Sequence, residues 1–114
     1  MYTRSENCPV KDICVQNGSG LTHIKELTDR AGMYDHGRMF AHVTLEPGRS
    51  IGYHTHDDSY EVIYVLSGEG TCYDGDQVYP VSAGMVQYCP QFDGHSIVNT
   101  GTEDLRLLGI IPNR

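Results

Sequence analysis

Apolar and polar residues alternate along most of this chain in short runs separated by glycine, proline and aspartate. Alternation with a period of two is typical of β-strands that bury one face, because successive side chains point to opposite sides. The predicted strands are Thr22–Leu27, Met39–Leu45, Tyr60–Ser67, Thr71–Tyr73, Gln77–Val81, Met85–Cys89, Ser96–Asn99 and Leu105–Ile111. A helical turn is expected around Thr28–Gly32.

Turn-forming residues lie between these strands. Glu46-Pro47-Gly48 has proline and glycine where a type II turn needs them, and Gly68-Glu69-Gly70 ends the strand before it. Asp74-Gly75 is a dipeptide favoured in two-residue hairpins. Strands at spacings of roughly 8–12 residues with turns between them predict an all-β barrel or sandwich.

The strand Tyr60–Ser67 is apolar on both of its faces. Val62 and Tyr64 lie on one face, and Ile63 and Val65 lie on the other. A strand of an isolated barrel is expected to have one face in water. The outer face therefore needs a cover, which another sheet, the N-terminal arm or a second subunit could supply. We expect a homodimer.

The first part of the chain differs from the rest. Residues 1–20 are polar and irregular and end in Gly18-Ser19-Gly20, which predicts an arm that is flexible or docked in a dimer. Residues 21–114 then form a single β-barrel domain, since 114 residues suffice for one compact domain and not for two.

Charge narrows the choice of partners. Eight basic residues against fifteen acidic ones give a formal net charge of −7. Nucleic acids and anionic membranes attract basic surfaces, so we expect neither as a partner. No apolar run is long enough for a membrane span or a signal peptide, so we expect a cytoplasmic protein with four reduced cysteines. Cys72 and Cys89 lie in strand-like runs and are expected to be buried.

Three histidines and one glutamate are the candidate chemical site: His54, His56, Glu61 and His95. His54 and His56 face the same side of an extended chain. The turn-like Asp57-Asp58-Ser59 resets the register, so that Glu61 can return to that side. Three imidazoles and a carboxylate suit a divalent metal ion. A His-x-His pair alone is also common on exposed strands, where it binds nothing.

These residues belong to two spaced patterns. The first runs from Gly48 through His54-x-His56 and Glu61 to Gly68, and the second consists of Gly84, Pro90, His95 and Asn99. The spacings resemble the two signature motifs of the cupin superfamily, over about residues 38–111. The resemblance implies an all-β, double-stranded β-helix (jelly-roll) barrel. It also implies that four residues are metal ligands: His54, His56, Glu61 and His95.

The second motif departs from the cupin pattern at one position. Phe92 stands where cupins usually have glycine, which puts the shape of the pocket rim in doubt. Gly94 is expected to supply the missing backbone freedom. Among single-domain cupins, the chain is most similar to small bacterial members described as oxalate-binding or manganese-binding, through Gly37–His42 and Gly52–His56.

Three functions fit such a site. The first is a metal-dependent enzyme of lyase or isomerase type, acting on an oxygen-chelating small acid or a sugar-derived substrate. The second is a dioxygenase that uses iron, copper or nickel. The third is a non-catalytic module that binds a small molecule or a metal. The expected cofactor is one divalent ion of manganese, iron, nickel or zinc.

Residues outside the ligand set offer few acid–base groups. His42 is the candidate proton carrier. If Met39, Ala41 and Val43 face inward, however, His42 faces outward. Arg38, Arg49 and Arg106 are candidate carboxylate clamps, or else solvated surface charges.

Overall fold

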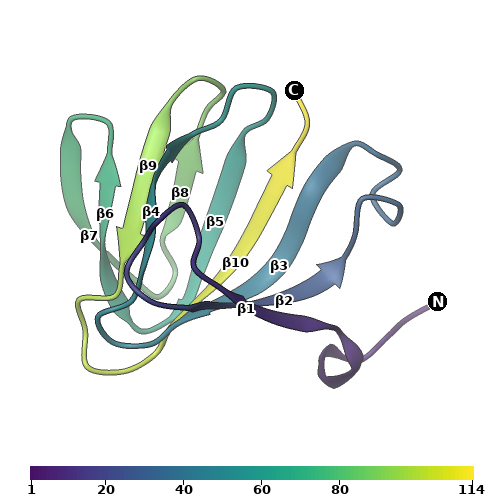
Figure 1. Ribbon diagram of the computed structural model, residues 1–114, viewed down its shortest axis with the longest axis horizontal. Coiled ribbons are helices and arrows are strands. Elements are labelled where there is room, and N and C mark those ends of the chain that lie inside the picture. Colours follow the sequence, from purple (N-terminus) through teal and green to yellow (C-terminus); the bar gives the residue numbers. More distant parts are fainter.

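Two antiparallel β-sheets face each other in a computed structural model that describes residues 1–114 (Figure 1). One sheet has six strands in the order β1-β2-β3-β10-β5-β8, and the other has four in the order β4-β9-β6-β7. The elements are η1 (Ser5–Asn7), β1 (Val10–Ile13), β2 (Thr22–Thr28), β3 (Gly37–Leu45), β4 (Ser50–Thr55), β5 (Glu61–Ser67), β6 (Glu69–Asp74), β7 (Gln77–Ser82), β8 (Val86–Cys89), β9 (Gly94–Val98) and β10 (Leu105–Pro112). The predicted all-β jelly-roll architecture is confirmed. No helix has the length and apolar character needed to cross a membrane.

The alternation of the sequence accounts for the core between the sheets. On β3, Ala41, Val43 and Leu45 are buried, and the residues between them are partly exposed. β10 lies between β3 and β5 (Figure 1). Its Leu105 and Leu107 are fully buried. Each such side chain contributes roughly 1.5–3 kcal/mol when it leaves water. The apolar core therefore holds the two sheets together.

Three local details differ from the predicted elements. β1 and β4 are strands that the pattern did not predict, since both are short and polar. β2 continues through Thr28, so the expected helical turn begins later, and Met33 N donates to Asp29 O at 3.0 Å. β2 pairs with β3 up to Thr28–Phe40, and this pairing carries the strand one residue past the predicted end at Leu27.

The N-terminal arm lies along its own barrel. β1 pairs with β2 at the edge of the larger sheet. Farther along, Gly52 N donates to Val15 O at 3.1 Å and Ser50 N donates to Ser19 O at 3.0 Å. Since Ser50 and Gly52 belong to β4, an edge strand of the smaller sheet, residues 10–19 bridge the two sheets on one side of the barrel.

The outer face of β5 remains open to solvent. Tyr64 and Leu66 are exposed there, and Val86 and Tyr88 on the neighbouring β8 are exposed beside them. Neither the second sheet nor the arm covers this face, because the arm lies at the opposite edge of the larger sheet. The chain itself therefore supplies neither of the two covers that it could provide, the second sheet and the arm.

The cysteines are all free thiols. Cys72 and Cys89 are buried, as predicted, and burial raises the pKa of Cys89 to about 12. A thiol with so high a pKa stays protonated at neutral pH and is a poor nucleophile. These two cysteines therefore act as small apolar residues.

His23 on β2 connects the arm to the body of the barrel. Its Nδ1 lies 2.5 Å from Asp12 Oδ1 on β1, and its Nε2 lies 2.5 Å from Glu46 Oε1 after β3. The hydrogen bond with Asp12, and then the one with Glu46, raises the pKa of His23. Only the protonated ring can donate to both carboxylates.

We therefore expect the arm to be held more firmly at low pH. The stabilising contribution is full below the unfolded-state pKa of about 6.5 and is lost as pH rises through the raised folded pKa. Hydrogen-exchange protection factors of Val10–Ile13, corrected for intrinsic rates, should fall as pH rises across this range. The fall should disappear in His23→Phe and persist in His36→Phe, a control at an exposed turn. Constant protection in the unmodified protein would contradict this role of His23.

Candidate metal centre

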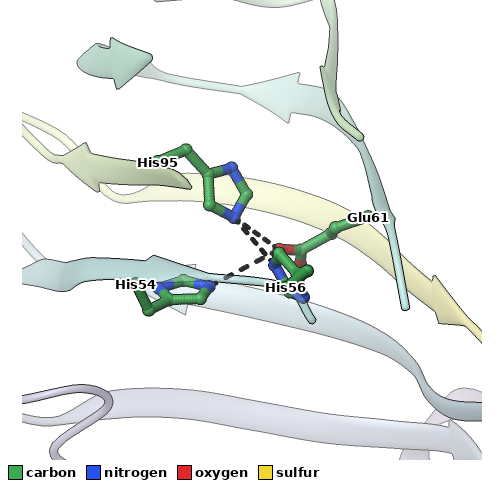
Figure 2. A group of neighbouring side chains, drawn as sticks. All are labelled: His54, His56, Glu61 and His95. Carbon is green, nitrogen blue, oxygen red and sulfur yellow. Dashed lines mark hydrogen bonds and ion pairs between the residues drawn. The ribbon is translucent and has the colours of Figure 1, made fainter. Parts of the chain in front are cut away.

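Four side chains from both sheets meet at one point inside the barrel (Figure 2). His54 lies on β4, His56 follows that strand, Glu61 begins β5, and His95 lies on β9. One ligand atom from each residue lies within 4.8 Å of all the others. The turn after His56 resets the register as predicted, because Glu61 belongs to the larger sheet and still points at the histidines of the smaller one.

Glu61 is the centre of this group. Its Oε1 lies 2.8 Å from His95 Nε2, 3.2 Å from His56 Nε2 and 3.9 Å from His54 Nε2. The Glu61 residue is only 7% exposed, and His56 and His95 are only 1% and 2% exposed. A buried carboxylate is costly unless positive charge or hydrogen bonds compensate it. In all three rings, therefore, the Nε2 atom points at the buried carboxylate of Glu61.

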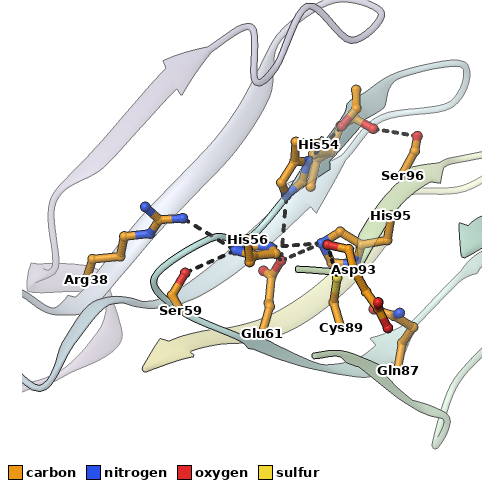
Figure 3. A network of polar contacts seen from close by, with 12 residues as sticks. Arg38, His54, His56, Ser59, Glu61, Gln87, Cys89, Asp93, His95 and Ser96 are labelled. Carbon is orange, nitrogen blue, oxygen red and sulfur yellow. Dashed lines mark hydrogen bonds and ion pairs between the residues drawn. The ribbon is translucent and has the colours of Figure 1, made fainter. Parts of the chain in front are cut away.

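Hydrogen bonds behind two of the rings decide which nitrogen carries the proton (Figure 3). Gln87 Nε2 donates to Tyr88 O at 2.8 Å, which leaves Gln87 Oε1 to accept from His95 Nδ1 at 2.9 Å. His54 Nδ1 donates to the carbonyl of Gly52 at 2.8 Å. When His54 and His95 are neutral, each Nε2 therefore carries a lone pair that can bind a metal ion, and only a ring protonated at both nitrogens can also donate from Nε2 to Glu61.

The protonation states of Glu61 and His54 favour the binding of a cation between them. Burial tends to raise the pKa of Glu61, but hydrogen bonds and charge from His56 and His95 outweigh it and lower that pKa to about 2. Burial lowers the pKa of His54. The carboxylate is therefore ionised and His54 is neutral at neutral pH, which are the forms that bind metal ions.

The donor set fits a divalent transition metal. Three imidazole nitrogens and a carboxylate oxygen suit manganese, iron, nickel or zinc, and the Nδ1 partners orient the rings as they do in metal sites. Four protein donors leave room for ligands from solution. When bound, such an ion supplies Lewis acidity toward the oxygen atoms of a ligand.

A cavity of about 270 Å³ opens beside the four side chains. Apolar residues of both sheets form much of its wall, among them Ile24, Ile51 and Ile97. The arm contributes Lys11, Val15 and Gln16. Val15 to Gly18 form a tight turn in which Gln16 and Asn17 have φ of 53° and 57° and Gly18 N donates to Val15 O at 3.0 Å. The arm is thus part of the pocket wall.

His42 does not join this group. Ala41 and Val43 on either side of it are buried in the core, so strand alternation turns His42 to the outer face of the larger sheet. It does not line the cavity, and burial together with the charges of Lys25 and Arg106 lowers its pKa. Of the two positions that the sequence left open for His42, the structure therefore has the outward one.

Phe92 keeps the backbone shape of the glycine it replaces. Its φ is +74°, in the region that favours glycine, and its side chain is exposed. Phe92 N donates to His56 O at 2.5 Å, and His56 N donates to Asp93 O at 3.2 Å, so the rim loop holds His56. Gly94 was expected to supply backbone freedom, but its role is to leave room for a neighbour. A Cβ at this position would lie 2.6 Å from the Tyr53 ring.

Gln87 and Ser59 are supporting residues that sequence reasoning missed. Gln87 is 3% exposed and orients His95, and Ser59 Oγ lies 3.3 Å from His56 Nδ1. The signal for Gln87 was present, since it shares the inward face of its strand with the buried Cys89. A polar residue at an inward position of an apolar strand indicates a buried partner.

Comparisons with known proteins agree with this geometry. Residues 41–111 match the family model of the cupin domain, and the chain belongs to this family. It is 36% identical over 107 residues to a Thermotoga maritima protein described as an oxalate-binding protein, covering 94% of this chain and 88% of that protein. A crystal structure of a predicted oxalate decarboxylase from Thermotoga maritima is 34% identical, with a TM-score of 0.96 over 100% of both chains.

A plant relative is also similar. The chain is 34% identical over 104 residues to auxin-binding protein 1 of Arabidopsis thaliana, covering 81% of this chain and 50% of that protein. The chain thus spans about half the length of this second relative.

We expect His95→Ala to abolish stoichiometric metal, because it removes a ring nitrogen directed at the centre of the group. Gln87→Leu should lower metal affinity about 10–100-fold, since it removes the group that orients His95. Elemental analysis and titration with a metal-sensitive dye measure both effects. His42→Ala, on the outer face, is the control and should keep full metal content. Full metal content in His95→Ala would exclude this ligand set.

Proposed function

We propose that this chain holds one divalent ion on His54, His56, Glu61 and His95 and uses it to bind a small acid that offers two oxygen atoms. The observation that carries the proposal is the convergence of ring nitrogens on a buried, ionised carboxylate at the cavity. The ion would be manganese, iron, nickel or zinc, since imidazole and carboxylate donors suit these metals.

Charge and size favour a small anion. A divalent ion with one carboxylate ligand has a net positive charge, which attracts acids in spite of the negative charge of the whole chain. The cavity of about 270 Å³ lies just below the range of roughly 300–1,000 Å³ typical of drug-sized ligands. The similarity to an oxalate-binding protein supports a chelating acid of the oxalate type.

Beyond binding, we propose chemistry of lyase or isomerase type on such an acid or on a sugar-derived substrate. A Lewis-acidic ion polarises a carbonyl or carboxylate without a change in its own oxidation state. Glu26 is the one pocket carboxylate outside the ligand set, and its Oε1 lies 3.7 Å from Lys11 Nζ. Glu26 and Lys11 are therefore the residues of the pocket wall that could exchange a proton with a substrate.

We expect the metal-loaded protein to bind oxalate with a measurable heat in calorimetry and to lose that heat after treatment with a chelator. Restoring the metal should restore binding. Oxalate binding to the metal-free protein would contradict the proposal. A panel of oxalate, keto acids and uronates then separates an enzyme from a binding module, because only an enzyme converts one of them to product.

The open outer face of β5 and β8 fits a second copy of this chain. We propose a homodimer in which the faces formed by Tyr64, Leu66, Val86 and Tyr88 pack against each other. These side chains are apolar or aromatic and uncharged, so the surface is suited to a twofold contact with itself. Exposed clusters of this kind on small domains mark interaction sites.

Light scattering at micromolar concentration should give twice the chain mass of 12.7 kDa. Tyr64→Lys combined with Val86→Lys should give the mass of one chain, because it places like charges in the centre of the contact. Val78→Lys, at an exposed apolar position of the other sheet, is the matched control and should leave the dimer intact. A monomer mass for the unmodified protein would rule the homodimer out.

A further inference from the structure

Arg38 occupies an irregular position at the start of β3. Along β10, Ile111 pairs with Met39 and the next residue, Pro112, pairs with Gly37, so Arg38 has no partner across the ladder. Proline has no N–H to donate, and strands tolerate it at such irregularities. Arg38 is therefore the extra residue of a β-bulge, a device that redirects a side chain.

The bulge turns Arg38 toward the cavity. Neighbouring residues on a regular strand face opposite sides, yet Arg38 and Met39 both line the pocket. The Arg38 side chain extends toward His56, with Nη2 3.4 Å from His56 Nδ1 (Figure 3). A guanidinium group thus lies behind one candidate metal ligand, at the pocket wall.

The Arg38 guanidinium lacks a strong partner within the protein. The other cation of the pocket wall, Lys11, pairs with Glu26 at 3.7 Å. Apart from the 3.4 Å contact with His56 Nδ1, Arg38 has one ion pair, with Asp58 Oδ1 at 3.9 Å, and the Asp58 side chain is 86% exposed. Exposed ion pairs of this kind contribute little. The planar fork of donors is therefore available to an anion in the pocket.

The contact with His56 also depends on which nitrogen of that ring holds the proton. Arginine only donates, so His56 Nδ1 accepts from Arg38 only when the proton is on Nε2. A ring that binds a metal through Nε2 keeps its proton on Nδ1 and can donate it to Ser59 Oγ, 3.3 Å away. Arg38 then has no acceptor in that ring.

We propose that Arg38 receives the second carboxylate of a dianionic ligand and so selects small dicarboxylates over monocarboxylates of similar size. This inference rests on the proposed function, because the ligand's other oxygen atoms face the ion site. The charges agree: a divalent ion with Glu61 leaves one positive charge, and Arg38 adds a second. Arginine is suited to the task, because its fork matches a carboxylate in a bidentate contact.

The test compares oxalate with glycolate, a chelating acid that has one carboxylate, on the full-length manganese-loaded protein. Arg38→Met should weaken oxalate binding on the order of 10–100-fold in calorimetry, as expected for loss of a charge-assisted contact. Glycolate affinity and bound manganese should not change. Arg38→Lys should recover part of the oxalate affinity, and it also serves if the methionine variant does not fold. Arg30→Met, in an exposed turn, is the matched control.

The outcomes separate this inference from the proposed function. If the unmodified protein binds oxalate and Arg38→Met binds it equally well, Arg38 is not the anchor, although the proposed function stands. Equal losses for oxalate and glycolate, or a loss of manganese, would show that Arg38 supports the metal site rather than selectivity. If the loaded, unmodified protein binds no oxalate, the proposed function itself fails.

Discussion

The contact between one buried carboxylate and three imidazole rings is the constraint on which the rest of this structure depends. Glu61 comes from the larger sheet, and His54 and His95 come from the smaller one, so the group joins the two sheets where the apolar core gives way to the cavity. Removing one partner of a buried charge typically costs about 3–5 kcal/mol. The barrel must therefore keep the strands in register to within one residue, because a slip would turn a ring out of the site.

Local rules predicted three of the four site residues, and His95, which lies on a later strand, was added through the resemblance of the second motif to that of the cupins. Period-two alternation places His54 and His56 on one side, and the turn before Glu61 restores the register. Arg38 and His42 could not be placed in the same way. The direction of Arg38 depends on a bulge opposite Pro112, far along the chain, and the face of His42 depends on which residues of β3 meet the core. Both directions depend on how β3 pairs with other strands, and the sequence of a single strand does not reveal its pairing.

The arm and the rim loop show a second limit of the pattern. Residues 10–19 are too polar and too short to predict strands, yet the two sheets have edges with unpaired backbone groups that the arm satisfies. Phe92 has a side chain that disfavours a positive φ, but two backbone hydrogen bonds between the rim loop and His56 hold it there. In both places, tertiary hydrogen bonding outweighs local preference.

The position of β10 has a consequence for how this protein is made. The strand nearest the C-terminal end lies in the middle of the larger sheet, between β3 and β5. A nascent chain that lacks residues 105–112 would leave the facing edges of β3 and β5 unpaired, together with the apolar side chains that β10 covers. Such edges favour association between chains. Because β3 and β10 are distant in sequence, the larger sheet closes only after β10 has been synthesised. The chain is therefore most prone to association, and most in need of chaperones, just before that point.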